Sequence, residues 1–423
     1  MEISKRTISW IGALGAAALL LGVLWIMCPG HSKSVILISI DALRADRLGC
    51  YGYSRETTPA LDRVAAKGVL FEEASTTGSW TIPSHASLFT GLYPRAHEMR
   101  YANSRLPEDV VTLASVLGDN GFSTGAFVNV HLLSKKRGFS RGFDDYRSIR
   151  PAPGPAGSVE QINREAIEWL GRHRDQPFFL FLHYYDVHSD YQVLPEYRAK
   201  FCGPYSGIAT GGTDQLKRHR SGEIALDTQD AQHLSNLYDA GVRQFDDAMA
   251  RFFVKLEALG LFDKAILVIA SDHGEEFFEH GDFLHSRTLY QELIHVPLIM
   301  SGPGLPEGIR IREPVSLVDV APTIASLLGV AFPRNIDGVD LSGLWKGDVD
   351  DAAPRTIFAD ADLWAHNPKE SHRRLLRQGN YTLHWDSSTD HYSLFDLNAD
   401  PGETKNIAES KPEVFLDLRA KLA

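Results

Sequence analysis

Cysteine is scarce in this chain of 423 residues, and Cys28, Cys50 and Cys202 are too few for the disulfide framework of a small secreted domain. The sequence leaves a Cys50–Cys202 pair open for a protein outside the cell. Positive charge is also in short supply, since 43 Lys and Arg residues against 54 Asp and Glu residues give a net charge of −11. No basic cluster is interleaved with aromatic residues, so nucleic acid is not an expected partner. An anionic substrate would have to be held by a local site, because the charge of the whole chain does not attract it.

One long uncharged run occurs over residues 8–28, shortly after Lys5 and Arg6. As a helix it would extend about 30 Å, the hydrocarbon thickness of a bilayer, and the basic residues before it favour a cytoplasmic N-terminus. A cleaved signal peptide is the alternative, but the run is long and no clear small-x-small cleavage site follows it. We therefore expect residues 1–32 to form a single-pass membrane anchor and linker, with the rest of the chain on the extracytoplasmic side.

Roughly 390 residues remain, enough for one large α/β domain with an appendage or for two domains. Continuous apolar runs predict buried parallel strands over residues 34–41, 123–129, 177–186 and 264–272. Apolar residues at helical spacing predict helices over residues 111–120, 160–173 and 234–259. Residues 203–229 show neither pattern and are predicted to be an irregular surface segment.

Polar side chains follow each predicted strand at the point where the apolar run ends. Because ligands bind at the carboxyl ends of strands in open α/β sheets, these side chains are candidate site residues. They are Asp41, Asn129, His131, Asp186, His188, Asp272 and His273. A purely structural role is the alternative for each of them, such as a turn cap for Asp41.

Residues 79–90 place a hydroxyl group, that of Thr81, where a helix should begin. Pro83 suits the first turn of a helix, where its missing N–H would have no partner. Because a helix start attracts anions, a tetrahedral oxyanion held there would meet the Thr81 oxygen, which is our candidate nucleophile. A capped helix without any chemistry is the alternative for this motif taken alone.

Asp272 and His273 offer a hard oxygen and an imidazole nitrogen, a combination that suits zinc or manganese. Asp41 and the Thr81 oxygen would complete a set of four ligands. Such a metal would lower the pKa of the Thr81 hydroxyl and neutralise charge on the reacting group. His285, in the polar stretch that follows, is a candidate to assist the leaving group.

These motifs, taken together, resemble the sulfatase family within the alkaline phosphatase superfamily. The resemblance lies in residues 40–44, 81–91, 186–188, 271–275 and 288–299, and it continues through 319–329 and 394–403. It implies an α/β fold in which helices flank a mixed sheet, with a catalytic domain over residues 33–345. It also implies a small C-terminal α+β subdomain over residues 346–423, whose short antiparallel sheet takes strands from 374–385 and 392–397.

The resemblance assigns roles residue by residue. It places metal ligands at Asp41, Asp272 and His273, the nucleophile at Thr81, and contacts to the oxyanion or leaving group at His131, His188 and His285. Asn129 and His285 stand where lysines are common, and His85 stands where an arginine follows the nucleophile, so we expect His85, Asn129 and His131 to bind substrate.

The departures from the family pattern concern the nucleophile and the metal. Sulfatases oxidise a Cys or Ser to formylglycine, whereas oxidation of Thr81 would yield a ketone, and His85 breaks the conversion signal; formylglycine is not expected. Ala42 replaces a second ligand Asp. These changes favour an unmodified threonine with zinc or manganese, as in phosphodiesterases and phosphotransferases of the superfamily, although calcium stays possible.

The leading hypothesis is a metal-dependent hydrolase of phosphate esters, or less readily of sulfate esters. In it Thr81 attacks in line, His188 or His285 assists the leaving group, and water releases the covalent adduct. An alcohol in place of water would make the same site a transferase. A second metal on Asp186, His188 and His285 is conceivable, but no D-x-x-x-H spacing supports it. A membrane-anchored protein that binds an anionic glycan or lipid without turnover is the alternative from another class.

Overall fold

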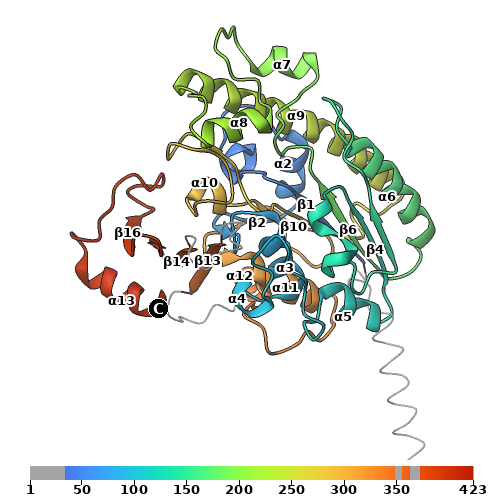
Figure 1. Ribbon diagram of the computed structural model, residues 1–423. Helices are drawn as coiled ribbons and strands as arrows, with labels where there is room; N and C mark the ends of the chain where they lie inside the picture. The colour runs from blue at the N-terminus through green and yellow to red at the C-terminus, as the bar shows by residue number, and fades with distance from the viewer. Residues whose placement is uncertain (1–33, 348–354, 363–371, 423) are drawn as a thin grey trace, which may run out of the picture.

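A computed structural model describes residues 34–347, 355–362 and 372–422 of the chain, and a mixed eight-stranded sheet runs through its centre (Figure 1). The strand order is β11-β2-β10-β7-β1-β6-β4-β5, in which β1, β4, β5, β6 and β7 are parallel and β10 runs against β7 and β2. The strands are β1 (Ser34–Ile40), β2 (Gly68–Phe71), β4 (Ser123–Val128), β5 (Asp145–Ser148), β6 (Phe178–Tyr184), β7 (Ile266–Ala270), β10 (Leu298–Ser301) and β11 (Ile309–Ile311). The predicted mixed sheet is confirmed.

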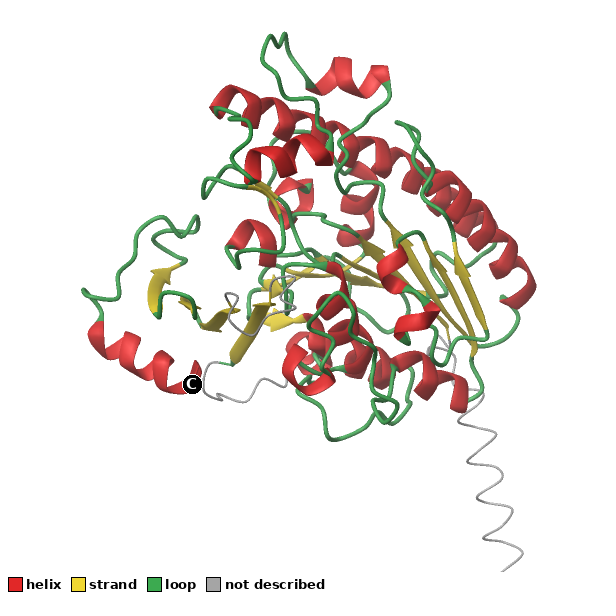
Figure 2. Ribbon diagram, viewed as in Figure 1, coloured by secondary structure: helices red, strands yellow, loops and turns green. Residues whose placement is uncertain are grey.

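Helices cover both faces of this sheet (Figure 2). One face carries α2 (Pro59–Ala66), α6 (Val159–His173) and α9 (Thr228–Ala258), and the other carries α3 (Thr81–Thr90), α5 (Leu113–Asp119), α11 (Val320–Leu327) and α12 (Ser342–Lys346). Alternate side chains of each buried strand point to opposite faces. In β1, Ile36 and Ile38 pack in the core on the α9 side, whereas Val35 and Leu37 pack in the core on the α3 side. The central strands are apolar throughout because both faces are covered.

The C-terminal part forms a second, antiparallel sheet of four strands. Its strands are β13 (Thr356–Asp362), β14 (His372–Gln378), β15 (Tyr381–Asp386) and β16 (His391–Asp396), and α13 (Pro412–Leu422) packs against it. Leu289, Leu293 and Ile294 of the larger part form a small core with Ala359 and Leu375 of this sheet. The domain boundary near residue 346 stays a prediction.

The remaining helices and strands of the described residues are short. They are β3 (Ala74–Ser75), β8 (Glu276–Phe277), β9 (Phe283–Leu284), β12 (Val315–Ser316), α4 (Pro94–His97), α7 (Pro195–Phe201), α8 (Thr213–Arg220), α10 (Gln291–Ile294), η1 (Ala45–Arg47), η2 (Gly49–Tyr51), η3 (His131–Leu133), η4 (Lys135–Arg137) and η5 (Leu317–Asp319).

The description of the fold bears on three expectations from the sequence, which concern residues 203–229, the pair Cys50–Cys202 and the membrane anchor. The segment 203–229 was expected to be irregular, but it contains α8, because Leu216 is buried in the core on the α9 side and anchors a turn of otherwise polar residues. Cys50 and Cys202 are free thiols rather than a pair. Among the described residues no helix has both the length and the apolar character needed to cross a bilayer, and the predicted anchor over residues 8–28 lies outside them.

Candidate metal centre and active site

Four buried side chains from three neighbouring strands converge at the carboxyl end of the central sheet. Asp41 directly follows β1, His183 lies near the end of β6, and Asp272 and His273 follow β7. His183 Nε2 lies 3.3 Å from Asp41 Oδ2, and His273 Nε2 lies 3.3 Å from Asp41 Oδ1 and 3.5 Å from Asp272 Oδ2. One ligand atom each of Asp41, Asp272 and His273 falls within a 4.8 Å cluster. The predicted convergence of these three residues is therefore present, with His183 added.

Strand alternation explains why these groups meet on one side of the sheet. In β6, Phe179 and Phe181 pack on the α3 side, so His183, two residues further along, faces α3 as well. In β7, Val268 and Ala270 pack on the α3 side, and Asp272 continues the same alternation. The donors of neighbouring parallel strands thus gather beneath α3.

The polar atoms that face one another in this cluster have no hydrogen-bond partner, although their side chains are buried. These atoms are both carboxylate oxygens of Asp41, Oδ2 of Asp272, and Nε2 of His183 and of His273. Buried polar groups are nearly always paired, and each one left unpaired costs roughly 1–3 kcal/mol. A divalent cation placed among them would satisfy all of these atoms together.

The other nitrogen of each imidazole fixes the ring for metal binding. His183 Nδ1 donates to Asn129 Oδ1 at 3.1 Å, and His273 Nδ1 donates to the carbonyl of Gly274 at 2.8 Å. Each Nε2 therefore faces Asp41, where it can offer its lone pair to a metal ion once it carries no proton. A second hydrogen bond of this kind is typical of histidines that ligate metals.

The ionisation of the buried acids and histidines in this cluster also favours a bound cation. Burial alone would raise the pKa of Asp41, but His188, His183 and His273 outweigh it and hold that pKa well below its usual range. Burial and the charge of Asp41 raise the pKa of Asp272 to about 7. Burial opposes a proton on His273, yet Asp272 and Asp41 raise its pKa to about 10. In the metal-free protein a proton on His273 thus offsets the two acids, and a divalent ion would take over this role and release the proton.

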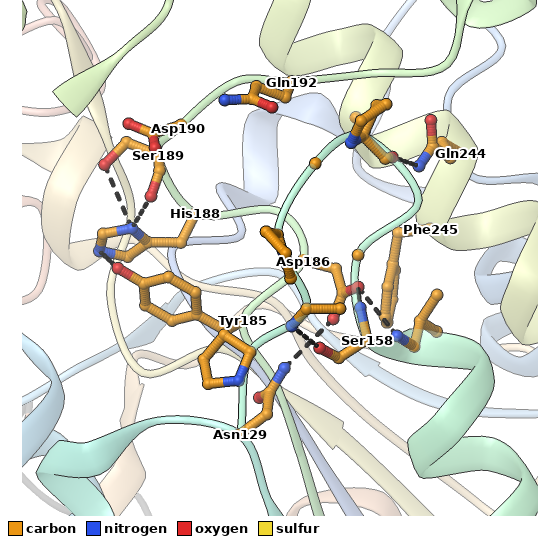
Figure 3. A pocket seen from close by; sticks show the side chains of 18 of the residues that line it. Asn129, Ser158, Tyr185, Asp186, His188, Ser189, Asp190, Gln192, Gln244 and Phe245 are labelled. Carbon is orange, nitrogen blue, oxygen red and sulfur yellow. Dashed lines mark hydrogen bonds between the residues drawn. The ribbon is translucent and has the colours of Figure 1, made fainter. Parts of the chain in front are cut away.

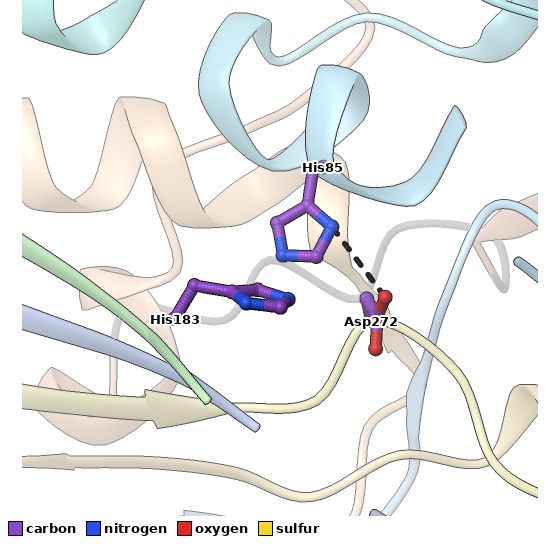
Figure 4. A group of neighbouring side chains, drawn as sticks. All are labelled: His85, His183 and Asp272. Atoms are coloured by element: carbon purple, nitrogen blue, oxygen red, sulfur yellow. Dashed lines mark ion pairs between the residues drawn. The ribbon is translucent and has the colours of Figure 1, made fainter. Parts of the chain in front are cut away.

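Thr81 is the first residue of α3, it is 2% exposed, and no side chain caps this helix start. Its carbonyl accepts a hydrogen bond from His85 Nδ1 at 2.9 Å, and the same nitrogen lies 3.5 Å from Asp272 Oδ2 (Figure 4). The side chain of His85 therefore links the first residue of α3 to the cluster. The Nε2 atom of His85 pairs with Ser39 Oγ at 2.9 Å. Burial lowers the pKa of His85 to about 3, so this ring is a neutral support between α3 and the sheet.

Two further histidines line the outer side of the cluster. His285 Nδ1 donates to Glu275 Oε1 at 2.8 Å, and its ring centroid lies 4.2 Å from that of His273 and 4.8 Å from that of His188. His188 stacks on Tyr185, with ring centroids 4.1 Å apart. Burial lowers the pKa of His188, and burial together with His273 holds that of His285 well below its usual range. Each ring donates through Nδ1, His188 to the carbonyl of Ser189 and His285 to Glu275, so Nε2 is the atom left to accept a proton.

A cavity of about 290 Å³ has His188 in its wall (Figure 3). Asn129, Tyr185 and His188 contribute to its wall, as do residues 151–155 and 157–159. Asn129 Nδ2 donates to Asp186 Oδ2 at 3.4 Å while its Oδ1 holds His183, so this amide links the cavity to the cluster.

The structure places the remaining candidates elsewhere. Asp186 accepts the backbone N–H groups of Ser158 and Val159 at the start of α6, at 2.6 and 2.9 Å, and this use of its carboxylate argues against a second metal on Asp186, His188 and His285. His131 opens η3 and is exposed, and within the described residues no hydrogen bond, ion pair or ring contact joins it to the cluster. Its role in substrate binding stays a prediction.

Sequence reasoning missed His183 and the partner of His285. A histidine within a continuous apolar strand was a signal, because a buried polar group needs a partner. Glu275, which is fully buried, follows the Asp-His pair closely in the sequence but was not given a role.

Comparison with known proteins gives a consistent result. Residues 33–330 match the Sulfatase family, and residues 278–423 match the family described as N-sulphoglucosamine sulphohydrolase, C-terminal. The Delta 4,5-hexuronate-2-O-sulfatase of Bacteroides thetaiotaomicron is 24% identical over 415 residues, which cover 90% of this chain and 85% of that protein. Arylsulfatase K of Xenopus laevis is 24% identical over 451 residues, covering 94% and 83%. The phosphonate monoester hydrolase of Agrobacterium radiobacter has the same fold, with a TM-score of 0.77, 21% identity, and coverage of 92% of this chain and 94% of the other.

Proposed function

Because the chain belongs to the sulfatase family, we propose that it is a metal-dependent hydrolase that cleaves phosphate esters in preference to sulfate esters, with Thr81 as nucleophile. The observation that carries this proposal is the cluster of unpaired buried atoms on Asp41, His183, Asp272 and His273 beside the start of α3. The two carboxylates and two imidazoles face one another, and five of their atoms have no hydrogen-bond partner, which is an arrangement that a bound metal ion would satisfy.

The donor set favours zinc or manganese over calcium. Calcium prefers six to eight oxygen ligands, whereas two of the four strongest donors here are imidazole nitrogens. Asp41, Asp272, His273 and the Thr81 hydroxyl would hold the ion, and His183 joins them as a ligand that the sequence did not reveal. When bound, such an ion supplies charge neutralisation for the transferred group and a lower pKa for the Thr81 hydroxyl.

The Thr81 oxygen would form a bond to phosphorus as the bond from phosphorus to the leaving alcohol breaks. The N–H groups at the start of α3, which no side chain caps, would stabilise the negative charge on the other phosphoryl oxygens. Water would then attack phosphorus, break its bond to the Thr81 oxygen and release phosphate. These steps need no modified residue, which fits a threonine at this position.

His188 is the better placed of the two candidates for the leaving group, because it lines the cavity into which that group would extend. Its neutral ring would take up the proton that Thr81 loses and pass it to the departing oxygen. His285, which donates to Glu275 and lies against His273, would instead orient the metal side of the site.

The choice of phosphate over sulfate rests on Thr81 itself. A sulfate ester is the expected substrate for the two relatives by their names, and it is the second candidate here. The neighbour named as a phosphonate monoester hydrolase indicates that this fold also accommodates phosphorus chemistry. A transferase, in which an alcohol replaces water, would use the same first step.

The test is to assay the purified protein, with Mn²⁺ or Zn²⁺, against matched aryl phosphate monoesters, aryl phosphodiesters and aryl sulfates. Thr81→Ala should lower kcat/KM by at least about 1,000-fold with its metal content retained, because a nucleophile is lost. Thr81→Ser should keep measurable activity. Thr90→Ala is a matched control at the other end of α3, where that hydroxyl bonds to the helix carbonyl of Ala86 and to the N–H of Leu92.

Two results would contradict the proposal. Cleavage of sulfate alone would overturn the substrate preference, and full activity of Thr81→Ala would overturn the nucleophile. If wild type turns over none of these esters but binds phosphate as tightly as Thr81→Ala does, the non-catalytic binding protein is the better description.

Membrane attachment through residues 8–28 also stays part of the proposal. Cell fractionation tests it, since the full chain should remain with membranes after an alkaline carbonate wash, whereas a chain that starts at residue 33 should not. Recovery of both chains in the soluble fraction would contradict it.

A further inference from the structure

The carboxylate side chains that line the cavity beside His188 have no lysine or arginine beside them in the described part of its lining. The cavity is lined by residues 151–155 and 157–159, by Tyr185, Asp186, His188, Ser189, Asp190 and Gln192, and by Asn129, Thr213, Gly241, Gln244 and Phe245. Two of these side chains are carboxylates, and none is a lysine or an arginine.

Two arginines near this cavity, Arg251 and Arg243, pair with carboxylates outside its lining. Arg251 of α9 pairs with Glu160 at 2.5 Å, and Arg243 pairs with Glu56 and with Asp247 at 2.8 and 2.9 Å. Arg150 precedes the wall segment 151–155, but it is exposed and is not part of the lining.

The N-terminal end of α6 also lies in this wall, but its N–H groups already bind a carboxylate of the protein and do not offer an anion site. Asp186 accepts the first N–H groups of the helix, those of Ser158 and Val159. This contact requires a glycine at residue 157, where a Cβ atom would come within 2.0 Å of Asp186 Oδ1. The partial positive charge of the helix start is thus neutralised by the protein itself.

The remaining groups that could contact a leaving alcohol include amide and aromatic side chains. Figure 3 shows Asp190 and Gln192 on the His188 side of the cavity, with Gln244 and Phe245 across from them. The side chain of Asp190 is exposed, whereas that of Phe245 is buried. An alcohol with hydroxyl or ammonium groups finds acceptors here, whereas a second carboxylate, sulfate or phosphate finds no lysine or arginine among the described residues that line the cavity.

We propose that this cavity selects esters whose leaving alcohol carries no second negative charge, and that it prefers a cationic alcohol to a neutral one. This inference rests on the proposed function and narrows its substrate class. The negative charge of the substrate is then confined to the group that Thr81 attacks. Asp190 and Gln192 are the residues that set this preference without touching the reacting atoms.

The experiment uses three phenyl phosphates that carry hydroxymethyl, carboxymethyl or trimethylammoniomethyl at the meta position, assayed with the full-length manganese-loaded protein. After correction for the pKa of each phenol, kcat/KM for the carboxylate ester should be at least about tenfold below that of the neutral ester, from charge repulsion over several Å. The ammonium ester should be cleaved at least as well as the neutral one. A carboxylate ester cleaved as well as the neutral one overturns the inference.

Two variants locate the effect. Gln192→Lys should raise kcat/KM for the carboxylate ester selectively, by about fivefold or more, and Asp190→Asn should reduce the advantage of the ammonium ester. Gln229→Lys, which adds the same charge at the exposed start of α9, is the matched control and should change no ratio. Equal effects of Gln192→Lys and Gln229→Lys would show that the selection does not arise in this cavity.

Thr81→Ala separates this inference from the proposed function. If the variant keeps its activity on all three esters, the nucleophile is wrong. If activity depends on Thr81 but follows no charge order, only the present inference fails. If wild type cleaves none of the three, both fail.

Discussion

His183→Phe tests the metal centre at the one ligand that sequence reasoning did not supply. Phenylalanine keeps a flat ring on the α3 side of β6, but it removes the Nε2 lone pair that lies 3.3 Å from Asp41 Oδ2. It also removes the hydrogen bond from Nδ1 to Asn129. The ring stays buried beside Phe181, so the fold should tolerate the change.

The expected size of the effect follows from the number of donors. Four-ligand zinc sites in peptides bind with about 10–16 kcal/mol in total, so each donor contributes roughly 3 kcal/mol. Loss of one donor should therefore weaken binding by roughly 100-fold. Isothermal titration of chelator-treated protein with Mn²⁺ and with Zn²⁺ measures this change, and metal analysis after dialysis provides an independent check.

His97→Phe is the matched control. His97 is as buried as His183, but its ring pairs with Ser87 Oγ at 3.0 Å and accepts the N–H of Met99 at 3.0 Å, outside the cluster. This variant should lose stability with no change in metal affinity. If His183→Phe binds metal as tightly as wild type, His183 is not a ligand, and the reasoning from unpaired atoms is wrong.

Four further predictions concern stability and the support of the site. Removal of metal should lower Tm, since a ligand at 100 times its Kd stabilises by about 2.7 kcal/mol, and calorimetry with and without chelator checks this. Burial opposes a proton on His280, but Glu292, at 2.7 Å, raises its pKa to about 8, so its contribution of roughly 2 kcal/mol is complete below pH 6.5 and is lost as pH rises through 8. The stability difference between wild type and His280→Gln at pH 6 and pH 9 measures it, and equal differences would contradict it. Asp246→Ala should cost about 1–2 kcal/mol in denaturant unfolding, because this carboxylate accepts two N–H groups in the first turn of α2. Gly274→Ala should reduce both Tm and metal affinity, since its Cβ would lie 1.9 Å from the Glu292 carbonyl oxygen, whereas Gly171→Ala, with open space around it, should reduce neither.

The strands that carry the site could be predicted from the sequence because each of them is marked by a local pattern of residues. A continuous apolar run marks a strand that is buried on both faces, and β1, β6 and β7 lie within the ranges that these runs indicated. Polar residues at the ends of such runs meet at one edge of the sheet. Asp41, Asp272 and His273 were found in this way.

The sequence did not predict contacts that depend on distant packing. Asp186 was a candidate ligand by position, but its carboxylate caps α6, which starts 27 residues earlier in the chain. Nothing in the spacing of His131 and His188 shows that His188 reaches the cluster while His131 stays exposed. His183 was within reach of sequence reasoning, because alternation from Phe179 and Phe181 places it on the α3 side, but the apolar run was interpreted as core alone.

A threonine nucleophile places a demand on the site that a formylglycine would not. An aldehyde hydrate has a second hydroxyl on the same carbon and can expel its ester from that side, whereas Thr81 has one oxygen and its adduct breaks down only when a second molecule attacks the transferred group. That molecule must arrive opposite Thr81, along the path by which the alcohol left. In the proposed mechanism the cavity beside His188 would provide this path, and His188, having given its proton to the alcohol, would take one from the incoming water. One imidazole thus serves both steps, and the same geometry would accept an alcohol as readily as water if the cavity excluded water. Substitutions in the cavity wall, rather than at the metal ligands, should therefore change the ratio of hydrolysis to transfer that is measured with added alcohols.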